Sequence, residues 1–145
     1  RGLGELSAAN TEYPDLVGDV LASLLQAAAR VEAEGVPRSS VWIDPGVGFA
    51  KSAAQSLQLL GSLGSFVETG YRVLVGPSRK FFIAELAPSL NGERPDPTER
   101  LGGTVAAVTL SALAQVHAVR VHDGSEARQA VRLVEALRQG REAAS

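Results

Sequence analysis

Three short polar segments of this chain have residue types that can bind an anion or a flat heterocycle. The first runs from Asp44-Pro45-Gly46 to Ser52 and follows a short apolar stretch. A carboxylate placed there can accept two parallel N–H bonds from a ligand edge, and the N–H groups that open a following helix can meet an anion. The segment lacks the spacing of the Walker loop and of the dinucleotide fingerprint. Asp-Pro-Gly is also ordinary turn chemistry, so these residues alone leave both interpretations open.

The second segment is Gly76-Pro77-Ser78-Arg79-Lys80, which places two cations after another apolar stretch and just before an expected helix. Cations at this position favour an anionic or electron-rich ligand, and the helix dipole adds to that attraction. The segment is not a nucleophile elbow, because Gly-x-Ser-x-Gly would need glycine where Lys80 stands. A solvated pair of surface cations is the alternative interpretation.

The third segment is Arg120-Val121-His122-Asp123, at the end of a third apolar stretch. Because side chains alternate along a strand, Arg120 and His122 share one face, while Val119 and Val121 share the other. The valines are expected to pack on helices. The guanidinium can stack on an aromatic heterocycle or bind phosphate bidentately. An Arg and a His within an apolar strand are costly unless they are paired, which favours a ligand site here.

The elements that must position these segments are short strands alternating with helices. Apolar residues at helical spacing, glycines after helices and short apolar runs predict them. Helices are predicted over 15–34, from 57 to 70, from about 80, over about 98–115 and from about 125 to 140, with strands over 41–43, 72–76 and 118–121 and a Pro-rich loop at 87–97. His117, near the junction of a helix and a strand, is expected to be structural.

Strands that are apolar on both faces, each followed by a helix, indicate an α/β fold with a parallel sheet covered by helices. Two architectures share this local pattern, the doubly wound sheet and the (β/α)8 barrel. In both of them the loops after the strands carry the ligand site. Three strands make a poor doubly wound domain and an incomplete barrel, so the pattern alone does not choose between the two.

The composition favours small-molecule chemistry in a soluble protein. With 16 acidic and 14 basic residues among 145, the chain has no electrostatic reason to bind nucleic acid or an anionic membrane, and neither partner is expected. No apolar run approaches the roughly 20 residues that span a bilayer, and the lack of cysteine fits the cytoplasm. The chain begins with Arg1 and contains no methionine, so we expect that it is not a complete translation product.

Together and in this order, the three segments resemble those of the dihydropteroate synthases: Asp44-Pro45-Gly46 through Lys51, then Ser78-Arg79-Lys80, then Arg120 to Asp123. The fold of that family is a (β/α)8 TIM barrel. Arg1-Gly2 looks like the end of the family's segment at the fifth barrel strand. The resemblance therefore implies that residues 1–145 are a single partial domain, the C-terminal portion of the barrel, with strands six to eight and their helices.

The resemblance also implies a transferase of folate biosynthesis. The family's reaction condenses p-aminobenzoate with 6-hydroxymethyl-7,8-dihydropterin pyrophosphate, in the presence of Mg2+, to give 7,8-dihydropteroate and pyrophosphate. No metal ligand is expected in this chain, because the implied ligands lie mainly outside it and on the substrate, so we expect the chain alone to be inactive. The family also implies a homodimer, for which the apolar helix around 105–112 offers outer surface.

The substrate contacts that the resemblance implies lie in the same three segments. Asp44 would hold the pterin N–H groups, and Lys80 the pterin oxygen and a ring nitrogen. Arg120 would stack on the pterin and, together with His122, bind the departing pyrophosphate. The full implied set is Asp44, Phe49, Gly76, Ser78, Lys80, Phe81, Arg120 and His122, of which Lys80, Arg120 and His122 are expected to be catalytic.

Phe49 and Phe81 complete the implied set. Phe49 would border the pocket, and the helix that begins near Phe81 would offer backbone N–H groups to the p-aminobenzoate carboxylate. Two positions depart from the family. Phe81 stands where a small polar or basic residue is usual, which puts any side-chain hydroxyl contact in doubt. Ser56 stands where Asn is common, and we expect it to alter the packing of the loop.

Two other functions fit parts of the sequence. A pterin-binding methyltransferase domain would share the barrel and the pterin site, but it would have no use for a pyrophosphate-binding pair at Arg120 and His122. A non-catalytic partial barrel could instead act as an assembly module, because its exposed strand edges would seek partners.

Overall fold

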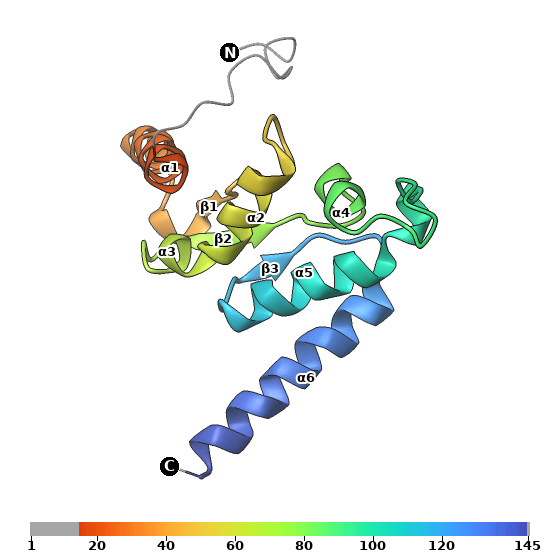
Figure 1. The fold of residues 1–145 in the computed structure, drawn as a ribbon. Helices are drawn as coiled ribbons and strands as arrows, with labels where there is room; N and C mark the ends of the chain where they lie inside the picture. The colour runs from red at the N-terminus through yellow and green to blue at the C-terminus, as the bar shows by residue number, and fades with distance from the viewer. Residues whose placement is uncertain (1–14, 145) are drawn as a thin grey trace.

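The computed structural model describes residues 15–144, and Figure 1 shows them as a small sheet surrounded by helices. In this part of the chain the strands are β1 (Trp42–Ile43), β2 (Arg72–Val75) and β3 (Ala118–Val119). They lie in the order β1-β2-β3, and both neighbouring pairs are parallel. The predicted α/β class with a parallel sheet is therefore confirmed. The assignment of Arg1-Gly2 to a fifth barrel strand lies outside the described residues.

The helices begin and end close to the predicted positions. α1 (Leu16–Ala33) begins at Asp15, whose carboxylate accepts the Gly18 N–H at 3.1 Å. It ends just before Gly35, whose φ of +91° suits glycine after a helix. The other helices and 3-10 turns are η2 (Arg38–Ser40), α2 (Ala53–Gly61), α3 (Leu63–Val67), α4 (Phe81–Leu86), η3 (Pro97–Glu99), α5 (Leu101–Leu113) and α6 (Gly124–Glu142).

Two helix predictions were wrong in their bounds. The helix expected from 57 to 70 is two helices, α2 and α3, separated at Ser62. α2 also begins earlier than expected, because Ser52 and Gln55 form a reciprocal capping box at its start. The last helix passes Gly140 and ends at Glu142, since a glycine weakens a helix without removing its backbone hydrogen bonds.

The strands are shorter than predicted, for a reason visible in the sheet. β3 was expected to reach residue 121, but its last sheet hydrogen bond joins the Arg120 N–H to the Val75 carbonyl at 2.9 Å. β2 ends at that same Val75, so the residues after Arg120 have no neighbouring strand to pair with. They form the start of the loop that leads to α6.

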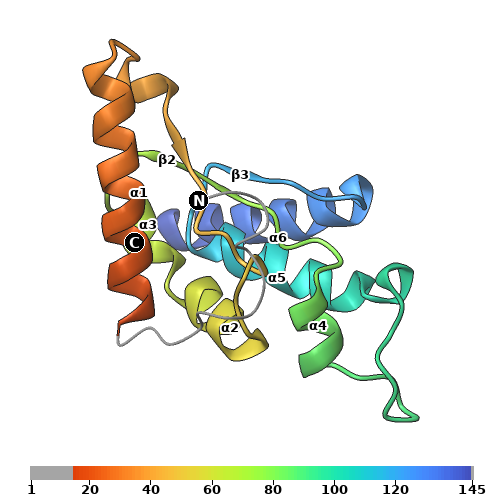
Figure 2. The ribbon, with the colours of Figure 1, turned by 90° about the horizontal axis from the view of Figure 1, so that it is seen from above.

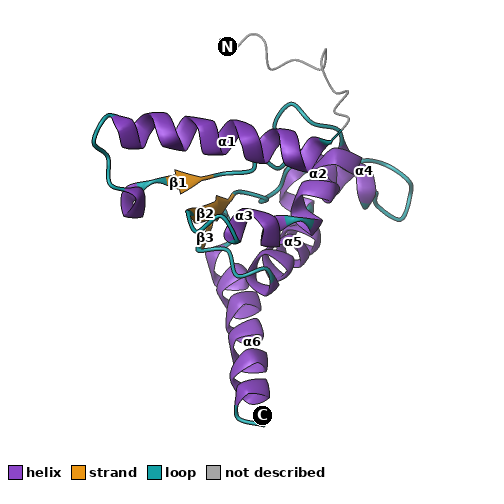
Figure 3. Cartoon of the chain, turned by 90° about the vertical axis from the view of Figure 1, so that its left-hand side faces the viewer, coloured by secondary structure: helices purple, strands orange, loops and turns teal. Residues whose placement is uncertain are grey.

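The core lies between β2 and the helices. β2 buries Val73 and Val75 completely. The helices add further fully buried side chains, namely Leu59, Leu63, Phe66 and Val108. Figures 1 and 3 show α6 on the outer side of α5, with its C-terminal half projecting away from the sheet. Seen from above in Figure 2, α1 lies along one side of the molecule, and α5 and α6 overlap across its middle. No helix in residues 15–144 is long and apolar enough to cross a bilayer.

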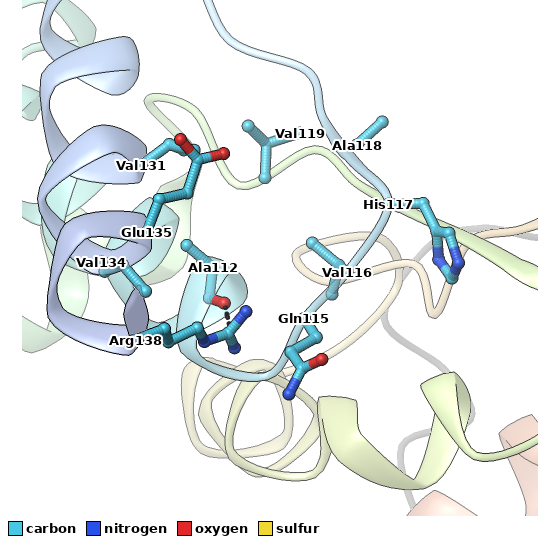
Figure 4. Close-up of a pocket in the computed structure, with 10 residues that line it drawn as sticks. All are labelled: Ala112, Gln115, Val116, His117, Ala118, Val119, Val131, Val134, Glu135 and Arg138. Atoms are coloured by element: carbon cyan, nitrogen blue, oxygen red, sulfur yellow. Dashed lines mark hydrogen bonds between the residues drawn. The ribbon is translucent and has the colours of Figure 1, made fainter. Parts of the chain in front are cut away.

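A pocket of about 270 Å3 at the amino end of β3 is closed by a contact between α5 and α6 (Figure 4). Arg138 of α6 donates to the carbonyls of Ala112, at 2.9 Å, and Leu113, at 2.8 Å. These carbonyls belong to the last turn of α5, where a cation is favoured; the Ala112 carbonyl also accepts the Gln115 N–H at 3.1 Å. Arg138 therefore joins the two helices at the end of β3 that lies away from Arg120 and His122.

We expect Arg138→Met to lower the free energy of unfolding by about 1–3 kcal/mol, because two carbonyls lose a charged donor. Urea denaturation of the protein measures the change. Arg128→Met is the matched control, since Arg128 lies on the same helix, is exposed and forms no hydrogen bond within residues 15–144. It should change stability by less than about 0.5 kcal/mol. Equal losses in the two variants would contradict the capping role of Arg138.

Candidate active site

The three polar segments meet at one edge of the sheet. Each directly follows a strand, and the carboxyl ends of parallel strands lie at the same edge. A pocket of about 340 Å3 there is lined by six residues of the second and third segments: Gly76, Ser78, Lys80, Arg120, Val121 and His122. The structure thus brings together five of the residues that the sequence predicted for ligand binding. Lys80 also connects this pocket to the first segment.

The loop after β1 is held in shape by its own side chains. The Gly46 N–H donates to Asp44 Oδ1 at 2.8 Å, so this oxygen closes a turn. Asp44 Oδ2 has no hydrogen-bond partner within residues 15–144, and it can still accept from a ligand. Ser56 is fully buried, accepts the Gly48 N–H at 3.2 Å and donates to the Ser52 carbonyl at 2.9 Å. Ser56 therefore anchors the loop to α2.

Lys80 crosses from the second segment to this loop. Its ammonium donates to the Val47 carbonyl and lies 3.7 Å from the centre of the Phe49 ring. Its aliphatic stem passes so close to Gly48 that a Cβ there would lie 2.5 Å from Lys80 Cδ. Gly48 also has a φ of +75°, and both facts require glycine. Phe49, Lys80 and the loop therefore form one wall of the site.

Both lysines of the chain, Lys51 and Lys80, have lowered pKa values. The pKa of Lys80 is lowered to about 8, chiefly by burial of the ammonium group; the charge of Asp44 opposes the shift, and those of Arg120 and Lys51 add to it. Burial also lowers the pKa of Lys51, again opposed by Asp44. The site therefore concentrates positive charge where solvent is partly excluded, which favours an anionic ligand.

Arg120 lies against the backbone of Gly76. A Cβ at Gly76 would be 3.2 Å from Arg120 Nη2, 3.3 Å from Nε and 3.7 Å from Cζ. Because Cζ is farther from this point than Nε and Nη2 are, the edge of the guanidinium that carries these two nitrogens faces the glycine. Val119 and Val121 border a second pocket with α6 residues. Val121 also lines the pocket of Arg120 and His122, so the predicted alternation is only partly observed after β3 ends.

Ser78 and His122 form a hydrogen-bonded pair between the second and third segments. Ser78 Oγ lies 2.9 Å from His122 Nδ1 and accepts the backbone N–H of His122 at 3.2 Å. The other histidine, His117, lies before β3, where its Nδ1 accepts the Val73 N–H at 3.1 Å. This backbone contact agrees with the structural role expected for His117.

Arg79 does not face the pocket, so the interpretation of two ligand-binding cations was wrong for one of them. Its Nε and Nη2 donate to the two carboxylate oxygens of Asp123, at 3.0 and 2.5 Å. This pairing lowers the pKa of Asp123 and raises that of Arg79. The Arg79 N–H donates to Thr104 Oγ1 at 3.0 Å, and Arg100 donates to the Arg79 carbonyl at 2.9 Å.

Sequence reasoning missed Thr104 and Arg100, because neither belongs to a segment that suggests chemistry. Phe81 was predicted and stands at the first position of α4, half exposed, with the Arg94 guanidinium 4.7 Å from its ring. No side chain caps the start of α4, and the Ile83 N–H of its first turn donates to the Lys80 carbonyl at 3.1 Å. Phe81 is not among the residues that line the pocket of Arg120 and His122.

The described residues do not form a metal site. Within residues 15–144, no group of three or more His, Cys, Asp or Glu side chains is placed to hold a metal ion. Both oxygens of Asp123 are used by Arg79, and one oxygen of Asp44 closes its turn. The charged groups of the pocket itself are cations, which suit an oxyanion.

Comparison with known proteins identifies the family. The model of the pterin-binding enzymes matches residues 4–122. The chain belongs to the pterin-binding enzyme family. It is 35% identical over 131 residues to dihydropteroate synthase of Escherichia coli K12, covering 90% of this chain and 44% of that protein. It is 38% identical over 122 residues to dihydropteroate synthase of Mycobacterium leprae, covering 84% of this chain and 43% of that protein.

Solved structures agree with this family assignment. Dihydropteroate synthase of Thermus thermophilus matches with a TM-score of 0.81 and 40% identity, over 90% of this chain and 49% of that one. The Xanthomonas albilineans enzyme, solved with 4-aminobenzoic acid, matches with a TM-score of 0.83 and 34% identity, over 95% of this chain and 47% of that one. The resemblance to dihydropteroate synthases is thereby confirmed. The chain spans less than half the length of these relatives.

The burial of Lys80 predicts a pH dependence of stability. Between pH 8 and 10.5 the unfolded chain holds the Lys80 proton more tightly than the folded one, so this group makes the free energy of unfolding rise with pH across that window. Lys80→Met should remove most of this rise, and Lys51, whose pKa is also lowered, should supply the remainder. Urea denaturation at several pH values tests this. Parallel curves for the two proteins would contradict it.

Proposed function

We propose that the protein carrying this chain is a dihydropteroate synthase. The observation that carries the proposal is the single pocket formed by Lys80, Arg120 and His122 at the carboxyl ends of β2 and β3, in a chain of the pterin-binding family. The Thermus thermophilus relative has been solved in complex with 6HMPPP, and the Xanthomonas albilineans relative with 4-aminobenzoic acid. The proposed substrates are therefore the pterin pyrophosphate and p-aminobenzoate.

In the proposed reaction, the amino nitrogen of p-aminobenzoate attacks the methylene carbon of the pterin substrate. The bond from that carbon to the pyrophosphate oxygen breaks, pyrophosphate leaves with the electron pair, and the proton lost by the amine passes to pyrophosphate or to water. Arg120 and His122 donate to the departing pyrophosphate, while Lys80 and the open oxygen of Asp44 hold the pterin. Catalysis then depends on orienting the two substrates and stabilising the charge of the leaving group. No covalent intermediate with the protein is needed.

The second substrate would occupy the wall formed by Phe49 and Lys80. The Phe49 ring is half exposed and already contacts the Lys80 ammonium at 3.7 Å, so an aromatic amine can pack beside both. The uncapped start of α4, at Phe81, would meet the carboxylate. Magnesium is expected with the pyrophosphate by resemblance, since the described residues offer it no ligand set of their own.

We also propose that the chain, over residues 1–145, is one partial domain that supplies strands six to eight of a TIM barrel. Support comes from three parallel strands in sequence order, each followed by a helix, with β1 and β3 at the two edges of the sheet. Unpaired edges of a parallel sheet are normally covered by further strands. Neighbouring barrel strands would pair with β1 on one side and β3 on the other.

Arg120→Lys should lower turnover at least about tenfold, equivalent to roughly 1.4 kcal/mol of transition-state stabilisation. Lysine keeps the charge but loses the planar group that would stack on the pterin and the two-pronged contact with pyrophosphate. Release of pyrophosphate by the full-length protein, with both substrates and magnesium, is the measurement. Arg128→Lys on α6 is the control and should leave turnover unchanged. Near-normal turnover of Arg120→Lys would reject the stacking role, and a wild-type protein without turnover would reject the proposed function.

A homodimer through the outer helices is also proposed. α5 and α6 border an apolar groove of about 590 Å3. Its leucines are strongly exposed, with Leu113 at 48%, Leu133 at 77% and Leu137 at 49%. Soluble monomers seldom expose adjoining apolar side chains of this size, and a twofold axis would let the same patch cover itself.

Leu133→Asp should convert the dimer to a monomer, because a charge would be buried at the centre of the proposed interface. Light scattering at micromolar concentration measures the mass. Leu90→Asp is the matched control, since Leu90 is fully exposed on the loop before η3, away from α5 and α6, and this variant should remain dimeric. A monomeric mass for the unmodified protein would contradict the proposal.

A further inference from the structure

We propose that Ser78 is a positioning residue that fixes His122 in the tautomer with its proton on Nε2. The imidazole would then present an N–H donor, and not a lone pair, to the pocket that it shares with Arg120 and Lys80. The tautomer follows from the hydrogen bonds of Ser78 alone. Its use for binding an anion rests on the proposed function.

The Ser78 hydroxyl belongs to a residue that is only 8% exposed. A hydroxyl has one hydrogen to donate and two lone pairs to accept with. One lone pair receives the backbone N–H of His122, at 3.2 Å. The other contact, at 2.9 Å, joins Ser78 Oγ to His122 Nδ1, and within residues 15–144 the hydroxyl has no further partner.

The hydroxyl hydrogen therefore has Nδ1 as its one available acceptor among the described residues. If Nδ1 carried the proton instead, it would donate to Ser78, and the hydroxyl hydrogen of this largely buried residue would be left without an acceptor among the described residues. Buried polar hydrogens are rarely left in that state. Nδ1 must then offer its lone pair, and the proton of the neutral ring lies on Nε2.

Nε2 is the ring nitrogen that remains for a ligand. His122 is exposed and lines the pocket with Arg120 and Lys80, and Nε2 has no partner within residues 15–144. With the proton on Nε2, all three side chains donate hydrogen bonds to the pocket. With a lone pair on Nε2, the ring would repel an oxyanion held by its two cationic neighbours. Ser78 thus acts on the ligand through His122.

His117 supplies an internal reference for the experiment. Its Nδ1 accepts the backbone N–H of Val73 at 3.1 Å, which also places the proton of its neutral ring on Nε2. A backbone N–H is not removed by substitution at Ser78. The two histidines of the chain should therefore share a tautomer in the unmodified protein and respond differently to a change at Ser78.

Nitrogen-15 NMR of the histidine-labelled, full-length protein, at a pH where both imidazoles are neutral, tests the tautomer without substrate. The unmodified protein should show the Nε2–H pattern for both His117 and His122, which His122→Asn assigns. Ser78→Ala should make the Nδ1–H form of His122 detectable, while His117 stays unchanged. Ser78→Thr keeps the hydroxyl and should restore the original pattern. An Nδ1–H pattern in the unmodified protein, or no change in Ser78→Ala, overturns the proposal.

Calorimetric titration with inorganic pyrophosphate tests whether the Nε2–H donor of His122 contributes to anion binding. Ser78→Ala should weaken binding about three- to tenfold with little change in melting temperature, and Ser78→Thr should bind as the unmodified protein does. Unchanged affinity in Ser78→Ala overturns the link to anion binding. The NMR result needs no turnover, so a protein that lacks synthase activity but shows the expected tautomer change would refute the proposed function and leave the role of Ser78 toward His122 intact.

Discussion

The two hydrogen bonds from Arg79 to Asp123 hold the segment after β2 against the segment after β3. Arg79 has a φ of +58°, a conformation that non-glycine residues adopt rarely. Contacts on its side chain, its N–H and its carbonyl all hold it there. Ser78 and Lys80 flank this anchored residue, and His122 precedes Asp123. The geometry of the pocket therefore depends on an ion pair that does not itself face the ligand.

Because Arg79 is paired with Asp123, the cations that remain for the pocket are those of other residues. Lys80 and Arg120 remain, and each approaches the backbone at a glycine, Lys80 at Gly48 and Arg120 at Gly76. Close packing of this kind partly removes the ammonium of Lys80 from water and lowers its pKa to about 8. The same low-dielectric surroundings strengthen the attraction of an anion once it is bound. The burial that lowers the pKa of Lys80 thus also suits the pocket to an anion.

Stability and ligand binding are assigned to opposite ends of β3. At its amino end, His117 accepts a backbone N–H of β2, and Arg138 caps the last turn of α5. At its carboxyl end, Arg120 and His122 line the pocket. This division is the one expected of a parallel α/β sheet, in which loops after the strands vary and the other end keeps the layers together.

The sequence by itself determined the order of the elements, the parallel sheet and the three segments that follow the strands, because these depend on local periodicity and turn residues. The break between α2 and α3 at Ser62 was harder to predict from the sequence, since the helix propensities of the residues there differ by little. Tertiary structure alone decided which of two adjacent cations lines the pocket. Arg79 and Lys80 look equivalent in sequence, and they differ because Asp123, 44 positions after Arg79, lies within reach of one of them. The fixed tautomer of His122 arises in the same way, from a serine 44 residues away. Partners so distant along the chain are brought together only by the pairing of β2 with β3. No local pattern of residues shows that these two segments will be in contact.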